Sequence, residues 1–546
     1  MWRIPFPDSG WRAYAWLGIV FVLYLRTLSF ELTFLDDNFL LRDKLSYLSD
    51  LSNIPAAFAQ GSWLGRGSDV YYRPLVIVSM MLDAAVGRGS LAVFHLTNTM
   101  FHFLSSCMVF VVLRKLGRPE RALPLALLYA VHPALAQSVA WMPSRSDSLL
   151  AVFLLASFAF FLDFLAERRW RPGLLHLLFF ALALLSKELA IVLPAVCAAY
   201  VLLRAPRRPP ARQAVGLALG WVVLLAAWYV VRLVVLEDAG AYTLSGTVHS
   251  VYTNLPALLL YLGKCVVPGG LSTYPILRDS TPAYGLAALL LLGVGLLLSK
   301  RWEPRALLMG GAWFILFLLP SLVYPESHIT PVFFEYRLQL PLVGLLLILG
   351  EMDAYERIPE RGRPLAFGVL LLAFFAAAWA NAGNYRDGLA FWTSAVDRSP
   401  NSAFAHRQLG VIHYFGGRFD AAAEEYGNAL RLNQREPMVH NNLGVIHKRA
   451  GRMREAEKEF LAEISLNPGF DGSYFNLGLI SYARGDGDRA AALWRKTVEL
   501  NPDHSESHKN LAIYYRLKGG LAASLRHCRE ARKLGARIDA RLCPAP

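Results

Sequence analysis

Long apolar runs with few charged residues follow one another along the first two thirds of the chain. About 20 apolar residues in a helix cross the hydrocarbon layer of a membrane, which tolerates few unpaired charges. The pattern therefore predicts about eleven membrane spans. They lie at residues 11–30, 91–113, 122–142, 148–166, 172–186, 188–203, 213–236, 282–299, 305–323, 332–351 and 364–381. A further apolar stretch, 252–268, contains two prolines and Lys264 and is predicted to be interfacial or re-entrant.

Basic residues in short loops tend to stay in the cytoplasm and so predict the orientation of the spans. With a cytoplasmic N-terminus, all five basic clusters fall on one side. These clusters lie at residues 114–121, 168–171, 204–212, 300–305 and 357–363. The outer side then receives the loop at 31–90 and everything after the last span. Because the chain has no Asn-x-Ser/Thr sequon, the expected location is a bacterial inner membrane with the C-terminal part periplasmic, rather than the endoplasmic reticulum.

After about residue 385 the chain becomes charged and alanine-rich, and a motif recurs there every 34 residues. The motif is Leu409-Gly410, then Leu443-Gly444, Leu477-Gly478 and Leu511-Ala512. In each unit a small residue follows thirteen positions after the leucine, as at Ala422. This period and spacing are typical of tetratricopeptide (TPR) repeats, each a pair of short helices. The predicted domains are therefore a membrane domain at 1–381, a half-repeat connecting helix at 382–402 and an α-solenoid of about four repeats at 403–546.

Repeat arrays of this kind usually bind proteins or peptides on a concave surface. Polar side chains that recur in the first helix of the units are candidates for contacting such a ligand. They are Asn441, Asn442, Asn476 and Asn510. The alternative is that these asparagines are scattered surface residues.

The placement of charge, the cysteine spacing and the motifs that the sequence lacks argue against several other classes of protein. The net charge of +14 would suggest nucleic acid as a partner, but the basic residues lie in the short loops that the topology assigns to the cytoplasm. The five cysteines form no CxxC pair, so no zinc site is predicted. The chain also lacks a P-loop, HExxH, GxSxG or a Rossmann glycine motif, so direct use of a nucleotide donor is not expected.

Polar and ionisable residues inside or beside membrane helices are costly, which makes each of them a candidate for function. On the predicted outer side they are Asp36, Asp37, Tyr72, Arg73, His95, His102, His132, Arg145, Asp147, Lys187, Glu188, Glu335 and Arg337. Each also has a structural explanation, since the carboxylates can mark the water boundary and the neighbouring opposite charges can form ion pairs. Where carboxylates face several cations, a carboxylate can deprotonate an acceptor while the cations neutralise a departing phosphate.

The order of these motifs resembles the TMTC proteins, which are transmembrane, tetratricopeptide-containing O-mannosyltransferases of the GT-C fold. The motifs run from Asp36-Asp37 through Phe94-His95-Leu96-Thr97-Asn98 and Lys187-Glu188 to Glu335-Tyr336-Arg337-Leu338. The resemblance covers nearly the whole chain. It departs at Ser144-Arg145-Ser146-Asp147, where relatives tend to have Gly-Arg-Ala-Asp, and in a repeat array shorter than that of the animal members.

The resemblance implies an all-α fold and an inverting transfer of a sugar, mannose or another hexose, from a polyprenyl- or dolichyl-phosphate donor to a serine or threonine hydroxyl of a protein. Asp36 is then the expected base, and Asp37 supports it or coordinates a divalent cation, the one cofactor left open. The residues expected at the lipid phosphate are Arg145, Lys187 and Arg337. Glu188 and Glu335 are expected to hold these cations in place.

Three other functions compete with this interpretation. A lipid or glycan transporter would also hold polar residues in the membrane, but charges near mid-bilayer or an internal repeat of the spans are not evident. A non-catalytic TPR scaffold for an envelope complex would not need the polar cluster. A transferase acting on a glycan or lipid would differ only in its acceptor.

Overall fold

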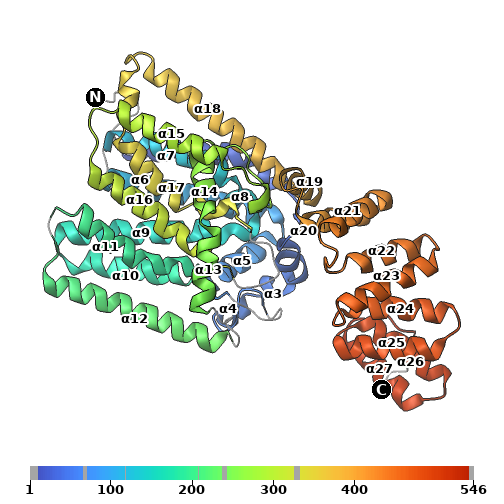
Figure 1. The fold of residues 1–546 in the computed structure, drawn as a ribbon. Coiled ribbons are helices and arrows are strands. Elements are labelled where there is room, and N and C mark those ends of the chain that lie inside the picture. The colour runs from blue at the N-terminus through green and yellow to red at the C-terminus, as the bar shows by residue number, and fades with distance from the viewer. Residues whose placement is uncertain are drawn as a thin grey trace. The chain divides into compact units, whose positions relative to one another are not determined.

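The computed structural model describes residues 10–64, 71–116, 119–206, 208–236, 243–324 and 332–539. Over these residues the chain consists of helices and connecting loops and has no β-strand, which confirms the predicted all-α fold class. The chain forms two compact units, Met1–Ser399 and Pro400–Pro546 (Figure 1).

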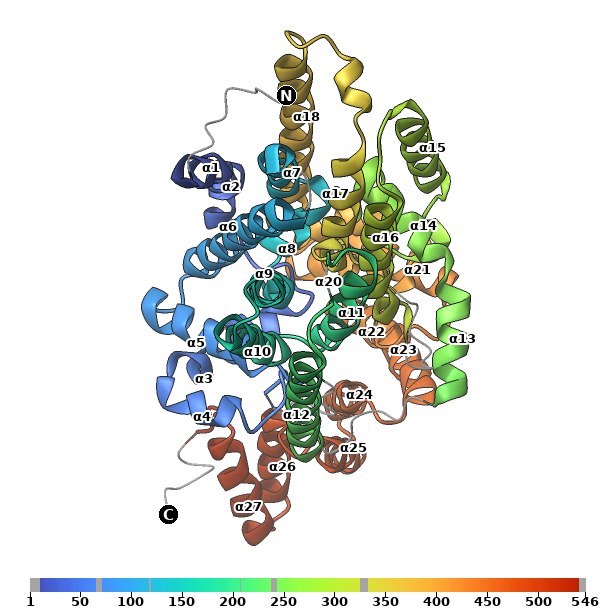
Figure 2. The ribbon, with the colours of Figure 1, turned by 90° about the vertical axis from the view of Figure 1, so that its left-hand side faces the viewer.

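The first unit contains the helices α1 (Gly10–Leu17), α2 (Ile19–Tyr24), α3 (Leu45–Ser49), α4 (Ile54–Ala57), α5 (Pro74–Gly87), α6 (Leu91–Leu116), α7 (Pro119–Ala130), α8 (Ala136–Ala140), α9 (Arg145–Glu167), α10 (Trp170–Leu184), α11 (Leu193–Leu203), α12 (Ala211–Val235), α13 (Leu244–Asn254), α14 (Pro256–Val266), α15 (Ala283–Leu298), α16 (Pro304–Leu318), α17 (Pro341–Glu351), α18 (Arg363–Ala382) and α19 (Gly388–Arg398). Helices α9, α10 and α12 run side by side, and α16 packs against α17 and α11 (Figures 1 and 2).

Five helical segments of the described chain are long and apolar enough to cross a membrane. They are Leu91–Leu116, Met142–Glu167, Ala211–Val235, Pro304–Leu322 and Arg363–Tyr385. A sixth span results if α7 and α8, which are bent by 51° at a short break, cross together. Helix α12 exposes Val222 and Val230 on its surface, as a lipid-facing helix does. The chain is therefore a multi-pass membrane protein.

Four of the remaining predicted spans coincide with shorter apolar helices, namely Trp170–Leu184, Glu188–Leu203, Ala283–Leu298 and Pro341–Glu351. Two predicted ranges differ in the structure. The first predicted span is divided at Gly18 between α1 and α2. In the range predicted as 332–351 the α-helix begins only at Pro341, after a 3-10 turn at Glu335–Leu338. Proline fits the first turn of a helix, where its missing N–H is not needed. The stretch at 252–268 contains the end of α13 and all of α14.

Short helices α3, α4 and α5 gather at one end of the long helices (Figure 1). They belong to the loop at 31–90, which was predicted to lie on the outer side. A cluster of buried side chains holds these helices together and includes Leu48, Met80, Met81 and Phe94. The packing fixes this loop, which supplies Asp36, Trp63 and Arg73 to one rim of the cavity described below.

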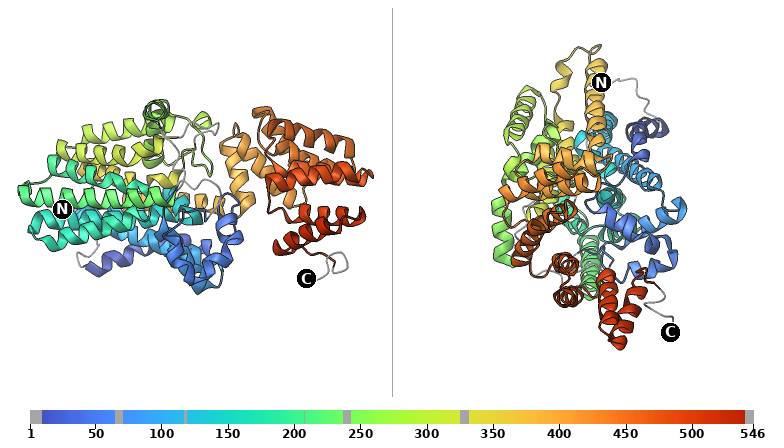
Figure 3. Two further views of the ribbon diagram at one scale, coloured as in Figure 1. Left: turned by 90° about the horizontal axis from the view of Figure 1, so that it is seen from below. Right: turned by 90° about the vertical axis from the view of Figure 1, so that its right-hand side faces the viewer.

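The second unit is a series of helix pairs: α20 (Ala403–Phe415), α21 (Phe419–Leu432), α22 (Val439–Arg449), α23 (Met453–Leu466), α24 (Asp471–Ala483), α25 (Gly487–Leu500), α26 (Ser505–Leu517) and α27 (Leu521–Lys533) (Figure 3). In the first three pairs, the repeat glycine of the first helix packs against the aromatic residue of the second. A Cβ added to Gly444 would come within 2.6 Å of the Phe460 ring. The recurring Leu-Gly pair therefore reflects the close approach of two helices, and the predicted TPR solenoid is confirmed.

Candidate functional site: an acidic turn and three cations around a cavity

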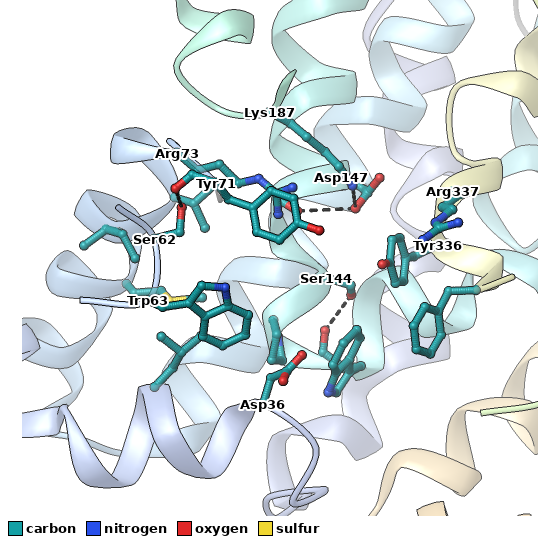
Figure 4. Close-up of a pocket in the computed structure, with 18 residues that line it drawn as sticks. Asp36, Ser62, Trp63, Tyr71, Arg73, Ser144, Asp147, Lys187, Tyr336 and Arg337 are labelled. Atoms are coloured by element: carbon teal, nitrogen blue, oxygen red, sulfur yellow. Dashed lines mark hydrogen bonds and ion pairs between the residues drawn. The ribbon is translucent and has the colours of Figure 1, made fainter. Parts of the chain in front are cut away.

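A cavity of about 260 Å³ lies in the first unit, between the loop helices and the ends of the long helices (Figure 4). Its charged lining residues are Asp36, Arg73, Asp147, Lys187 and Arg337. The other lining residues are Leu40, Ser62, Trp63, Tyr71, Val76, Ile77, Met80, Trp141, Pro143, Ser144, Ser146, Phe334 and Tyr336. Five of the residues that the sequence singled out therefore converge on one space from five separate parts of the chain.

The adjacent carboxylates Asp36 and Asp37 have different environments. The Asp37 carboxylate is buried and accepts hydrogen bonds from the backbone N–H groups of Thr33 (2.6 Å), Phe34 (2.9 Å) and Asn38 (2.9 Å), and from the Thr33 hydroxyl (2.9 Å). Phe34 has a φ of 62°, which a non-glycine residue adopts only when its surroundings impose it. Asp37 thus closes a tight turn, the acidic turn, and Asp36 in the same turn lines the cavity (Figure 4).

Burial raises the pKa of Asp37, while its hydrogen bonds to Thr33, Phe34 and Asn38 act in the opposite direction. Because its oxygens already accept four hydrogen bonds, Asp37 is poorly placed to coordinate the divalent cation considered from the sequence. Among the residues that the structure describes, no cluster of three or more His, Cys, Asp or Glu side chains has the arrangement of a metal site.

Two neighbouring residues, Lys187 and Glu188, make ion pairs with different helices. The Lys187 ammonium lies 2.6 Å from Asp147, in the first turn of α9. The Glu188 carboxylate accepts a two-pronged contact from Arg73, the residue directly before α5, with a closest distance of 2.9 Å. Lys187 can point one way and Glu188 the other because the backbone of Lys187 is extended. These pairs fasten the starts of α5 and α9 to the loop between α10 and α11.

Arg337 differs from the other two cations at the cavity. It donates hydrogen bonds to the Tyr324 hydroxyl (2.8 Å) and the Ser321 carbonyl (3.1 Å). Within the described ranges, no carboxylate pairs with it. Its guanidinium lies 5.9 Å from the centre of the Tyr336 ring, and the Lys187 ammonium lies 5.0 Å from the same ring. Arg337 thus brings a positive charge to the cavity wall without a described counter-ion.

Arg145, predicted at the lipid phosphate, does not line the cavity. It is fully buried, 2.5 Å from Asp83 of α5. It also donates hydrogen bonds to the Asn98 side chain (2.7 Å) and the Phe94 carbonyl (2.9 Å) of α6. These contacts join α5, α6 and α9 and leave Arg145 no path to a ligand in the cavity.

Glu335 and the predicted histidines also lie outside the cavity lining. Glu335 is buried and pairs with Lys264 of α14 at 2.5 Å. His132 Nε2 donates to the Cys265 carbonyl (2.9 Å), and His102 Nε2 donates to the Ala130 carbonyl (3.0 Å). His95 is buried against Phe30. These side chains therefore tie elements of the membrane unit together.

The remaining predicted residues are Tyr72 and the asparagines of the repeats. The Tyr72 hydroxyl donates to the Phe58 carbonyl (3.0 Å) and so braces the loop beside the cavity. In the second unit, Asn476 donates to the Asn441 side chain (3.2 Å) and accepts from Lys448 (2.7 Å). Asn441 also donates to Asn442 at 3.3 Å. Asn510 lies on α26, the next first helix along the array.

Aromatic residues that the sequence argument did not select form much of the cavity wall. Trp141 stacks on Phe334, with 5.9 Å between ring centres, and Phe334 stacks on Tyr336 at 5.2 Å. Trp63 lines the wall from the loop. The position of Trp141 just before the Ser-Arg-Ser-Asp motif was a signal that could have identified it, whereas nothing in the sequence marks Trp63.

The cavity combines groups that can accept a proton, bind an anion and contact an apolar chain. Asp36 contributes a carboxylate to the lining, and a carboxylate is a group that can accept a proton. Arg337 and Lys187 are donors suited to phosphate oxygens. Val76, Ile77 and Met80 add an apolar face from α5. This arrangement suits a ligand that joins an anionic group to an apolar part.

Two family models match the chain. One is described as dolichyl-phosphate-mannose-protein mannosyltransferase and matches residues 77–234. The other is the tetratricopeptide repeat, which matches residues 377–430, 407–469 and 475–537. The chain thus carries a region similar to that transferase family, followed by tetratricopeptide repeats.

Curated relatives carry the name protein O-mannosyl-transferase. Tmtc1 of Drosophila melanogaster is 31% identical over 184 residues, which cover 33% of this chain and 21% of the relative. TMTC3 of Mus musculus is 30% identical, and the match covers 24% of this chain and 14% of the relative. F38B6.6 of Caenorhabditis elegans is 21% identical over 66% of this chain and 54% of its own. The matched parts are thus about a fifth or less of the first two relatives.

Solved structures of two proteins illustrate a resemblance at low TM-scores. A crystal structure of MamA is 19% identical and covers 27% of this chain and 86% of its own, with a TM-score of 0.24. Pseudomonas aeruginosa pilF is 23% identical and covers 35% and 78%, with a TM-score of 0.26. Scores this low support no inference about the present chain.

Proposed function

We propose that this protein is a membrane glycosyltransferase that moves a sugar, mannose or another hexose, from a polyprenyl-phosphate donor to a serine or threonine hydroxyl of a protein. The observation that carries the proposal is the cavity in which Asp36 and the cations Lys187 and Arg337 line one space. The names of the relatives and the transferase family model that matches residues 77–234 support the reaction class.

The phosphate of the donor binds beside Arg337. Because no described carboxylate pairs with Arg337, an incoming phosphate need not displace one there. Lys187 can add a second contact by sharing its charge between Asp147 and the ligand, since an ammonium has three donors. The side chains of Val76, Ile77 and Met80 provide an apolar surface for the isoprenoid part next to the phosphate.

In the transfer step, Asp36 accepts the proton of the acceptor hydroxyl. The hydroxyl oxygen forms a bond to the anomeric carbon while the bond from that carbon to the phosphate oxygen breaks. The electron pair leaves with the lipid phosphate, whose additional negative charge is stabilised by Arg337 and Lys187. Attack from the side opposite the leaving phosphate inverts the configuration of the sugar.

The acceptor protein is held by the repeats at 403–546, which follow the transferase domain at 1–381 and the half-repeat helix at 382–402. The asparagines proposed to contact it are Asn441, Asn442, Asn476 and Asn510. The proposed location is a bacterial inner membrane, with the cavity and the repeats on the periplasmic side, since the basic loop clusters assign the opposite side to the cytoplasm.

The direct test is transfer of radiolabelled sugar from polyprenyl-phosphate donors to membrane proteins by the wild type and Asp36→Asn. Asp43→Asn is the matched control, because Asp43 is an exposed carboxylate of the same loop that pairs with Arg42. General-base catalysis contributes roughly 10²- to 10⁴-fold to a rate, so Asp36→Asn should lose transfer by that factor while Asp43→Asn keeps it. Parallel assays with EDTA report whether a divalent cation is needed.

Arg337→Met tests the donor site in the same assay and should raise the KM for the lipid-phosphate donor about tenfold or more. Size-exclusion profiles show whether each variant is folded. Full transfer by a folded Asp36→Asn variant would refute the assignment of the base. Absence of transfer with every donor, from a folded wild type, would instead favour a transporter or a scaffold.

A further inference from the structure

The end of α18, the short connection after it and α19 run along the segment that leads into the acidic turn, and three contacts join them. Arg26 donates to the Trp379 carbonyl (3.1 Å) and lies over the Trp379 ring. The backbone N–H of Glu31 donates to the Arg386 carbonyl (2.7 Å). The Trp392 indole N–H donates to the Thr33 carbonyl (3.0 Å). Residues more than 350 positions apart are thus aligned side by side up to the turn.

Helix α19 is itself held firmly in the first unit. Trp392 is fully buried, with its ring 4.9 Å from Phe391 and 5.9 Å from Tyr274. The Thr273 hydroxyl donates to the Phe391 carbonyl (2.8 Å). Asp387 caps the start of the helix by accepting from the backbone N–H of Ala390 (2.8 Å). The indole N–H of Trp392 therefore points to Thr33 from a fixed support.

Thr33 passes this support on to the acidic turn. Its carbonyl accepts from Trp392, while its own N–H and hydroxyl both donate to Asp37. Asp37 in turn holds the amides of Phe34 and Asn38, on either side of Asp36. A carboxylate that must meet a reacting hydroxyl depends on such support, because a displacement of about 1 Å can cost roughly a hundredfold in rate.

We infer that Trp392 is a positioning residue for Asp36, which acts through Thr33 and Asp37 and makes the geometry of the acidic turn depend on α19. The inference rests on the proposed function as far as Asp36 is the base. The position of Asp36 then depends on a residue of α19, the helix that comes directly before the repeat array in the sequence. Helix α19 ends at Arg398 and α20 begins at Ala403. A change at Trp392 is thereby transmitted to the turn through the hydrogen bonds of Thr33 and Asp37.

The experiment compares hydrogen exchange of the full-length chain, by mass spectrometry in detergent, for the wild type, Trp392→Phe and Trp221→Phe. Both variants keep an aromatic ring and lose one indole N–H bond, since Trp221 donates to His176 (2.7 Å) in a part of the membrane unit that does not line the cavity. Loss of one hydrogen bond should raise exchange of peptides covering residues 33–38 about three- to tenfold in Trp392→Phe and leave it unchanged in Trp221→Phe.

Two further variants address the relay itself. Thr33→Val removes the hydroxyl that donates to Asp37 and should raise exchange of the same peptides, whereas Thr33→Ser should restore protection. In the transfer assay, Trp392→Phe should lower kcat about ten- to a hundredfold with the donor KM unchanged, because the donor-binding cations are untouched.

Unchanged exchange at residues 33–38 in both Trp392→Phe and Thr33→Val would overturn the inference, whatever their activity. A rise in donor KM with kcat preserved would also overturn it, because Trp392 would then act on the donor site. Failure of the proposed function gives a different result, namely no transfer by the wild type. The exchange measurement still decides in that case whether Trp392 holds the turn.

Discussion

Replacing Arg145 by Met separates a structural cation from a ligand-binding one. Arg145 is fully buried, 2.5 Å from Asp83, and it donates to Asn98 and Phe94. Methionine would leave Asp83 as a buried carboxylate without its partner. Removing one member of a buried pair typically costs about 3–5 kcal/mol, because the desolvation of the remaining charge is no longer compensated. We therefore expect Arg145→Met to lower the free energy of unfolding by about 3–5 kcal/mol.

Two comparisons sharpen this prediction. The double replacement Arg145→Met with Asp83→Leu should recover most of the loss, since a buried ion pair exchanged for apolar residues of similar size is often neutral. Arg337→Met should cost only about 1–2 kcal/mol, because Arg337 donates to Tyr324 and Ser321 and has no described carboxylate partner.

The measurement is equilibrium unfolding of the purified chain in mixed dodecyl maltoside and SDS micelles, alongside binding of a polyprenyl-phosphate. Arg145→Met should unfold at a lower SDS fraction, and Arg337→Met should fold but lose affinity for the phosphate. An Arg145→Met variant with wild-type stability and abolished phosphate binding would refute the structural role and return Arg145 to the donor site.

Three further predictions concern other parts of the molecule. Gly444→Ala should destabilise the repeats by about 1–3 kcal/mol, because the added Cβ would meet the Phe460 ring. Gly427→Ala is the control and should not destabilise them, because a Cβ there meets nothing within 4 Å. Thermal unfolding of the two variants checks this prediction. Asp147→Asn should lower the donor KM several-fold in initial-rate assays, because it removes a carboxylate that competes with the phosphate for Lys187. The hydrogen bond and charge of Glu459 raise the pKa of His440. The pair of protonated His440 and Glu459 therefore stabilises the repeats fully below about pH 6.5, the ordinary pKa of histidine, and this stabilisation is lost as the pH rises through the raised pKa of His440. Protection of α22 and α23 from hydrogen exchange, corrected for intrinsic rates, should therefore fall with rising pH in the wild type but not in His440→Gln.

The helical architecture could be predicted from the sequence because its signals are local and periodic. The 34-residue recurrence identified the repeats, and in the structure Gly444 packs against Phe460 of the same unit. Uncharged runs located the apolar helices for the same reason. The bend between α7 and α8 was missed, since the apolar pattern continues through it.

The site could be predicted only in part because its residues are distinguished by distant partners. Arg145 and Arg337 look alike in the sequence, yet Arg145 is neutralised by Asp83, which lies 62 positions earlier. Asp36 and Asp37 are neighbours, yet Asp37 is held by hydrogen bonds inside a turn in which Phe34 has a positive φ, and Asp36 lines the cavity. Neither a pairing of distant side chains nor a left-handed φ at a phenylalanine can be read from local pattern.

Neighbouring repeats of the second unit pack against each other, through contacts such as those of α23 with α24 and α25 with α26. The stability of such an array is roughly a sum over units and the interfaces between neighbours. Duplication or loss of one 34-residue unit within a gene therefore disturbs only a local interface. A chain built in this way can gain or lose whole units without any change in the sequence of its membrane unit, so the surface of the array can vary independently of the helices that line the cavity.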